Sequence, residues 1–176
     1  LHDALPIWGG FTPADRRVSL LNPGIPVSPR SEELTGIRTE MLRDAPAPFE
    51  WLRDLADWMG ERPVVAHNAF FDLSFIRHEG FRTAQPADPR VKFNPPLIDT
   101  LALSRWLLPD IKNHKLNTVS EHLEIDLSRH HRAEADALAC GEIFARLWQQ
   151  SGAETLQELN LKAGHATDEM ILEHRR

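Results

Sequence analysis

Short apolar runs alternate along this chain with longer segments in which apolar residues recur at helical spacing. The short runs lie at 17–21, 63–67 and 97–99, and turn-forming or helix-capping residues follow each of them. Helical spacing marks residues 49–59, 69–79, 100–108 and 116–123, and a longer stripe begins at Ala133. A shorter helix is expected at 39–44. Strands that alternate with helices predict an α/β fold with a partly parallel sheet.

Single residues set the expected ends of these elements. Gly60 should end the helix at 49–59, because glycine is common just past a helix C-terminus. Asn68 is a good N-cap for the helix at 69–79, and Asp99 can cap the helix at 100–108. Residues 82–96 contain four prolines and are expected to form a loop.

The length of 176 residues corresponds to one domain with a short tail. We assign the domain to residues 8–150, incomplete at its N-terminus. Residues 151–176 are polar and less periodic, which predicts a loosely attached extension or the start of a further region.

The first seven residues have an unusual composition for the start of a domain. They are the translation of CTA CAC GAC GCT CTT CCG ATC, the end of a common sequencing adapter, and Trp8 supplies the T that follows there. We interpret residues 1–7 as an adapter-derived artefact and leave them out of the predicted fold. A chance heptapeptide is the alternative interpretation.

Composition narrows the classes of protein that this chain can represent. The net charge of -6 argues against a protein that coats nucleic acid non-specifically, although carboxylates that await cations also count as negative. The single cysteine, Cys140, excludes an internal disulfide and a cysteine-rich zinc site. Neither a membrane span nor a secretory signal is visible. We therefore expect a cytoplasmic protein that makes no contact with a membrane.

Two acidic residues stand where α/β proteins carry their chemistry. Asp72 falls in the first turn of a helix that directly follows an apolar strand, at the carboxyl edge of the predicted sheet. Asp136 lies about one turn into the last helix. Either residue taken alone is explained more simply by favourable interaction with the helix dipole, worth about 0.3–1 kcal/mol. Together they suggest a divalent-metal site, since hard cations prefer oxygen ligands.

A histidine accompanies the second carboxylate. His131 precedes Asp136 by five residues, a spacing that turns two side chains roughly 140° apart on a helix. His131 can therefore work with Asp136 only from the loop that leads into the helix. There it could act as a general base near neutral pH. His130 should point elsewhere, and Arg132 could contact a phosphate.

At this point the chain resembles the DnaQ-like (DEDDh) 3′–5′ exonucleases, and in particular the proofreading domain of PolC-type DNA polymerase III. The similar segments cover roughly residues 17–150 in the order of the family. They are 22–23, 33–37, 65–72, 98–100, 112–118 and 130–136. Each is weak alone, but the ordered set is specific, and the segment at 112–118 favours the PolC type.

The resemblance implies a ribonuclease-H-like fold with a mixed sheet flanked by helices, and two Mg²⁺ or Mn²⁺ ions in the intact parent. It assigns Asp72 and Asp136 as metal ligands and His131 as the general base. The implied substrate is the 3′ end of single-stranded DNA, with RNA also possible, and a polymerase module is the implied partner in cis or in trans. Residues that would border the substrate are Thr35, Gly36, Ile37, Asn68, Phe71 and Arg132.

The chain departs from the family in one respect. The first family motif, an Asp-x-Glu on the first and central strand, is absent from residues 8–176. We therefore expect a fold without that strand and a fragment with little or no activity. Three alternatives remain open: a stand-alone or helicase-fused exonuclease, a nuclease-dead domain that binds nucleic acid, and an unrelated α/β protein whose His and Asp residues are caps and core groups.

Overall fold

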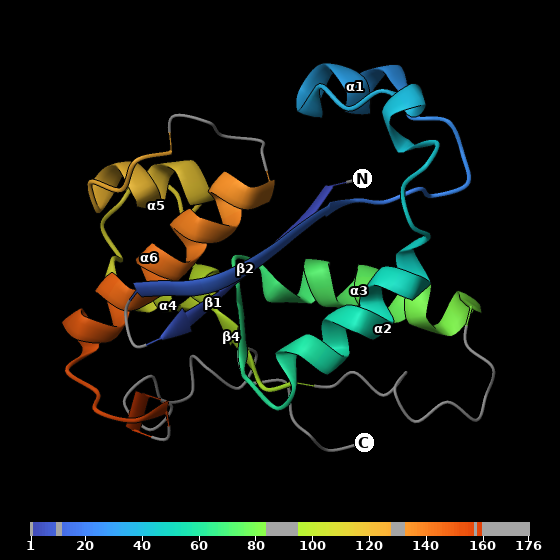
Figure 1. Ribbon diagram of the computed structural model, residues 1–176. Helices are drawn as coiled ribbons and strands as arrows, with labels where there is room; N and C mark the ends of the chain where they lie inside the picture. The colour runs from blue at the N-terminus through green and yellow to red at the C-terminus, as the bar shows by residue number, and fades with distance from the viewer. Residues whose placement is uncertain (1, 10–11, 84–94, 128–132, 157, 160–176) are drawn as a thin grey trace.

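The computed structural model describes residues 2–9, 12–83, 95–127, 133–156 and 158–159. Helices and strands form a mixed α/β arrangement (Figure 1). In chain order the elements are β1 (His2–Gly9), β2 (Thr12–Leu20), α1 (Pro29–Thr35), the 3-10 helix η1 (Thr39–Leu42), α2 (Pro48–Met59), β3 (Val64–Ala66), α3 (Ala69–Thr83), β4 (Leu97–Asp99), α4 (Thr100–Leu107), α5 (Leu116–His122) and α6 (Ala133–Ser151).

The described strands form two separate pairs. β1 and β2 are antiparallel, whereas β3 and β4 are parallel, with Val64 opposite Leu97 and Ala66 opposite Asp99. No hydrogen-bonded ladder joins the two pairs within the described residues. The helix α6 contacts both β1 and β3 and so connects the two pairs through packing.

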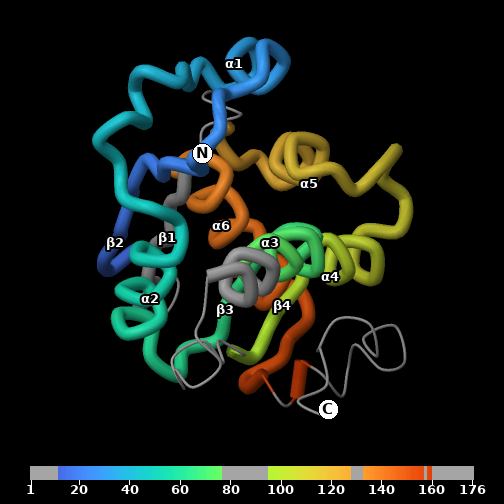
Figure 2. Tube along the Cα trace, turned by 90° about the vertical axis from the view of Figure 1, so that its right-hand side faces the viewer, coloured from blue at the N-terminus to red at the C-terminus, as the bar shows by residue number. Residues whose placement is uncertain are grey.

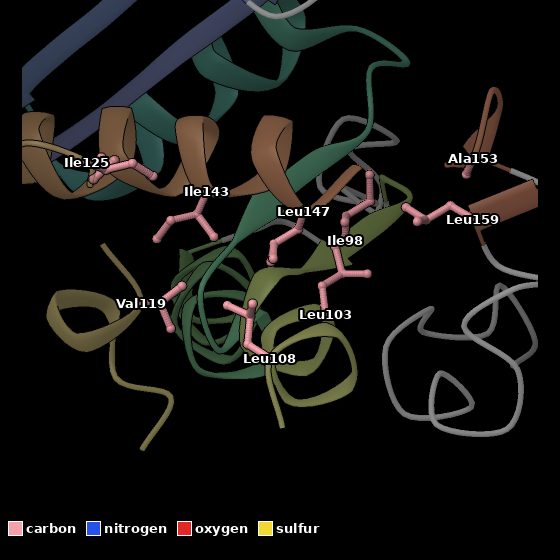
Figure 3. Close-up of a cluster of buried hydrophobic side chains, with 10 residues drawn as sticks. Ile98, Leu103, Leu108, Val119, Ile125, Ile143, Leu147, Ala153 and Leu159 are labelled. Atoms are coloured by element: carbon pink, nitrogen blue, oxygen red, sulfur yellow. The ribbon is translucent and has the colours of Figure 1, made fainter. Parts of the chain in front are cut away.

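The main core lies between α6 and the helices α4 and α5. Ile143 and Leu147 of α6 are fully buried and point toward Leu103, Leu108 and Val119 (Figure 3). The apolar stripe predicted for the last helix is thus the face that forms the core. A smaller cluster fixes the start of α3, where Ala69 and Leu73 pack against Leu97 of β4.

Most of the predicted elements are confirmed, and the parallel pair of β3 and β4 agrees with the partly parallel sheet that was expected. Gly60 follows α2 as its C-cap, with its N–H donated to the carbonyl of Ala56 at 3.0 Å. Asp99 caps α4 by accepting the N–H of Leu101 at 2.9 Å. The short helix expected at 39–44 is a 3-10 turn, η1.

The helix α1 was not predicted from the sequence. Its residues are polar, and none of its side chains is buried, so it carries no apolar stripe. Local signals create it: Ser28 accepts the N–H of Ser31 at 3.2 Å, Pro29 begins the helix, and Gly36 ends it with φ of 71°. Figures 1 and 2 both show α1 at one end of the molecule, away from α4.

The capping role predicted for Asn68 is wrong in its geometry. An N-cap residue has extended φ and ψ, but Asn68 has φ of 72°, in the left-handed region that asparagine tolerates better than most residues. The N–H groups at the start of α3 are instead held by the carboxylate of Asp99.

Both ends of the chain also take part in the structure more than expected. Residues 2–9 pair with β2, although residues 1–7 were interpreted as adapter-derived. An unpaired strand edge readily accepts another strand, which explains this pairing. Ala153 and Leu159, in the segment expected to be loosely attached, are buried in the main core.

The loop expected at 82–96 falls mostly outside the described residues. Within the described part of the chain, no helix is long and apolar enough to cross a membrane.

The main core makes a direct prediction about stability. Leu147→Ala should lower the free energy of unfolding by about 2–5 kcal/mol, because the truncated side chain leaves a cavity beneath α6. Urea unfolding followed by circular dichroism measures the change. Leu34→Ala is the matched control: Leu34 is 56% exposed on α1, so the same truncation should cost less than about 1 kcal/mol. Equal losses in the two variants would contradict the assigned core.

Candidate active site

Asp72 is presented by the first turn of α3. Its carboxylate is exposed, whereas the next residue, Leu73, is buried against β4. The short apolar strand β3 therefore leads directly into a helix whose inner face is anchored and whose first acidic residue faces solvent. This is the placement that the sequence predicted for Asp72.

Asp136 occupies the equivalent position in α6, within its first turn, and is half-buried. Cys140 lies four residues later and shares the same face of the helix. Burial raises the pKa of Cys140 to about 12, a hydrogen bond with Thr100 opposes the rise, and the charges of Asp72 and Asp99 add to it. Cys140 is therefore held as the thiol.

Hydrogen bonds bring the start of α3 close to α6. Asp99 accepts the N–H of Ala69 in α3, and the next residue, Thr100, has its Oγ1 3.4 Å from Cys140 Sγ in α6. Figures 1 and 2 both show the first turn of α3 beside α6. The two predicted ligands thus come from the first turns of two helices whose starts lie near one another.

Two other predicted residues, His131 and Arg132, lie outside the described residues, as does His130. The proposed general base and phosphate contact therefore stay predictions. In the sequence all three precede Ala133, the first residue of α6.

The segment Thr35, Gly36 and Ile37 ends α1. Thr35 Oγ1 donates to the carbonyl of Ser31 at 2.7 Å and accepts the N–H of Ile37 at 3.2 Å. Gly36 has φ of 71°, a conformation that strains any residue with a Cβ. The turn is therefore locally built, and it lies on the arm formed by α1 and η1 rather than in the core.

An exposed aromatic pair flanks Asp72 on α3. Phe71 and Phe75 are 59% and 56% exposed, and their rings meet edge to face with centroids 4.9 Å apart. Phe71 was expected near the substrate. Phe75 was not singled out from the sequence, although its position one turn after Phe71 is the signal that could have found it.

A buried carboxylate joins the starts of two helices. Asp99 is 6% exposed, and its Oδ1 accepts the N–H of Leu101 at 2.9 Å and the N–H of Asn68 at 2.9 Å. Its Oδ2 accepts the N–H of Ala69 at 3.2 Å. The bonds to Asn68 and Ala69 could not be inferred from local sequence, because these residues are about 30 positions away.

His67 forms the second buried connection near the site. Its Nδ1 lies 3.0 Å from Thr100 Oγ1, and its Nε2 lies 2.8 Å from the carbonyl oxygen of His114. A carbonyl only accepts, so Nε2 must donate and carry the proton. In the neutral ring Nδ1 is an acceptor, so it shares the single hydroxyl proton of Thr100 with the carbonyl oxygen of Ala66, which lies 3.2 Å from Thr100 Oγ1. Thr100 Oγ1 can in turn accept from the thiol of Cys140 at 3.4 Å.

Burial lowers the pKa of His67 below its ordinary 6.5, while the bond with the carbonyl of His114 and the charge of Asp99 oppose this shift. The neutral form assigned by the hydrogen bonds is therefore also the favoured one. These contacts tie the residue that follows β3 to α4 and to the segment before α5.

The described residues supply part of a metal site. No group of three or more His, Cys, Asp or Glu side chains suited to a metal ion occurs among them. Asp72 and Asp136 offer two carboxylates in the first turns of α3 and α6, and carboxylate oxygens are the donors that Mg²⁺ or Mn²⁺ prefers. Two carboxylates are the right type of ligand for a hard cation, but a complete site needs more of them.

Comparison with known proteins identifies the family. The family model described as Exonuclease (RNase_T) matches residues 7–144. The chain belongs to this exonuclease family. The PolC-type DNA polymerase III of Bacillus cereus is 42% identical over 153 residues, which cover 85% of this chain and 10% of that protein. The PolC-type polymerase of Oceanobacillus iheyensis is 42% identical over 147 residues, 84% of this chain and 10% of that protein.

This exonuclease chain therefore spans about a tenth of the length of the curated relatives it matches. A solved structure, Exonuclease X in complex with 5′ overhanging duplex DNA, superposes with a TM-score of 0.63 at 24% identity. The match covers 88% of this chain and 84% of that one. It confirms the ribonuclease-H-like fold expected from the sequence.

The buried histidine makes the stability of the domain depend on pH. The folded state disfavours the protonated form of His67. The stabilisation of the fold that depends on neutral His67 is therefore fully present above pH 6.5 and is lost as the pH falls below that value. Urea unfolding should show a lower free energy of unfolding at pH 5.5 than at pH 7.5. His67→Gln should reduce this difference, whereas His122→Gln, at an exposed position, should leave it unchanged. An identical pH dependence in the wild-type and His67→Gln proteins would contradict the argument.

Proposed function

We propose that the complete domain is a 3′–5′ exonuclease that hydrolyses phosphodiester bonds at the 3′ end of single-stranded DNA and proofreads for a replicative polymerase. The observation that supports it most is the placement of Asp72 and Asp136 in the first turns of two helices whose starts lie near one another. Membership of the exonuclease family and similarity to PolC-type polymerases support the reaction class and the partner.

In this proposal Asp72 and Asp136 hold Mg²⁺ or Mn²⁺, the ions on which exonucleases of this kind generally depend. Bound divalent cations make water more acidic and stabilise negative charge on a leaving oxygen. Asp72 is exposed and Asp136 is half-buried, so both carboxylates remain accessible from solvent. The anchoring of Leu73 against β4 limits the movement of Asp72.

His131 is the proposed general base, and Arg132 the proposed phosphate contact. An imidazole is an effective general base near neutral pH, so His131, which precedes α6 in the sequence, would accept the proton of the attacking water. The buried His67 cannot substitute for it, because both of its ring nitrogens are already engaged with Thr100 and His114.

The remaining predicted residues would position the 3′-terminal nucleotides. Phe71, together with Phe75, presents an exposed aromatic surface next to Asp72, and stacking of one base on such a ring is worth about 1–3 kcal/mol. Asn68 stands at the turn between β3 and α3. The turn formed by Thr35, Gly36 and Ile37 is proposed to border the terminal nucleotide from the arm.

We further propose that this chain is itself inactive or nearly so. Two ions need more than two carboxylates, and no Asp-x-Glu occurs in residues 8–176. The division of the described strands into two pairs that both contact α6 fits a sheet without its central strand. A nuclease-dead domain that binds nucleic acid would share this deficit, so activity after repair of the motif separates the two functions.

A repair experiment tests the proposed function. The 176-residue chain should not shorten single-stranded DNA in the presence of Mg²⁺. Residues 8–176 joined to the first-strand segment of the Bacillus cereus relative should shorten a 5′-labelled strand progressively from its 3′ end, and a label at the 3′ end should be released first. Digestion from the 5′ end, or vigorous digestion by the unrepaired chain, would contradict the proposal.

The repaired protein also tests the assigned ligands. Asp136→Asn should reduce the rate by more than about 100-fold, since changing even the outer partners of a metal site typically costs 10–100-fold. Asp110→Asn is the matched control, because Asp110 is exposed at the end of α4 and away from the site. Full activity of Asp136→Asn, with its fold intact by circular dichroism, would remove Asp136 from the mechanism.

A further inference from the structure

Asp99 has more hydrogen-bond partners than its role as a helix cap requires. An N-cap side chain ordinarily accepts from the helix that it begins, as Asp99 does with the N–H of Leu101 in α4. Asp99 also accepts the N–H groups of Asn68 and Ala69, at 2.9 and 3.2 Å, where α3 begins. A single buried carboxylate therefore serves the N-terminal ends of two helices.

The register of the parallel pair makes this possible. Ala66 of β3 stands opposite Asp99 of β4, so both strands end at the same level and both helices start there. The backbone turns sharply at Asn68, with φ of 72°, and this turn brings two successive N–H groups toward the carboxylate. Negative charge is favourable at a helix N-terminus, and here two such termini share it.

Asp72 lies on the element that this arrangement holds. It follows Ala69 by three residues, within the first turn of α3, so the position of its carboxylate depends on where that turn begins. The opposite face of the same turn is fixed by Ala69 and Leu73 against β4. The apolar contacts fix how closely α3 packs against β4. The hydrogen bonds to Asp99 fix the orientation of its first turn and the residue at which it begins.

We infer that Asp99 is a positioning residue, which fixes the start of α3 and thereby holds Asp72 at the site facing Asp136. The inference rests on the proposed function of Asp72 as a metal ligand. Asp99 acts through α3 in this inference, because its carboxylate is buried and accepts three backbone N–H groups.

Amide hydrogen exchange followed by NMR in the 176-residue chain tests the contacts themselves. Asp99→Asn keeps one acceptor oxygen and replaces the other by an NH₂ group, which cannot accept from Ala69. We expect exchange at Ala69 to accelerate at least tenfold, with smaller changes at Asn68 and Leu101. Asp99→Ala should accelerate all three. Unchanged exchange at Ala69 in Asp99→Asn would overturn the inference.

Mn²⁺ added to the same samples tests the consequence for the site. In the wild-type chain we expect paramagnetic broadening of amide signals around both Asp72 and Asp136. In Asp99→Asn the broadening around Asp72 should fall at least twofold, while that around Asp136 remains. Equal broadening at Asp72 in the wild-type and Asp99→Asn proteins would overturn the positioning role, because a purely structural cap would leave the geometry of Asp72 unchanged.

A matched control and the two readouts keep the inference separate from the proposed function. Ser28→Ala removes the cap of α1, and it should accelerate exchange at Ser31 without altering exchange at Ala69 or broadening at Asp72. If the wild-type chain shows no broadening at Asp72 or Asp136, the proposed ligands fail. The exchange rates at Ala69 then still decide whether Asp99 holds the start of α3.

Discussion

The parallel pairing of β3 with β4 is the constraint on which the rest of the site depends. Each strand has only three residues, yet their register places Ala66 opposite Asp99 and so starts two helices at one level. The carboxylate of Asp99 then binds N–H groups from both helix starts. A charge buried in this way would be costly without such partners, and with them it fixes the geometry of the sheet edge. The position of Asp72 follows from this edge.

The helix α6 combines the core with the site. Ile143 and Leu147 pack against α4 and α5, whereas Asp136 and Cys140 lie nearer its start, where Cys140 contacts Thr100. The apolar packing of its C-terminal half thus holds the acidic residue of its N-terminal turn in place. Cys140 also reaches Thr100, which bonds His67, so a continuous chain of hydrogen bonds runs from α6 to the loop at His114.

The sequence predicted those parts of the fold that depend on local pattern. Apolar runs identified β3 and β4, helical spacing identified the face of α6 that carries Leu147, and Asp99 was recognised as a cap of α4. The contacts of Asp99 with Asn68 and Ala69 were beyond local reasoning, because they join residues about 30 positions apart in the chain. The helix α1 was missed because its capping signals lie in a polar segment, and Leu159 because one apolar residue in a polar tail gives no periodicity. For the site, the order of motifs predicted the placement of Asp72 and Asp136 in helix N-terminal turns, while His131 and Arg132 stay predictions.

The central claim is that the carboxylates of Asp72 and Asp136 converge on one cation site. Anomalous X-ray diffraction at the manganese edge, from crystals of the domain repaired with an Asp-x-Glu strand and soaked in Mn²⁺, tests it most directly. The account predicts anomalous peaks between α3 and α6, with oxygens of both Asp72 and Asp136 within about 2.0–2.3 Å, near the distances seen for Mg²⁺. Mn²⁺ bound elsewhere, or to one of the two residues without the other, would contradict it.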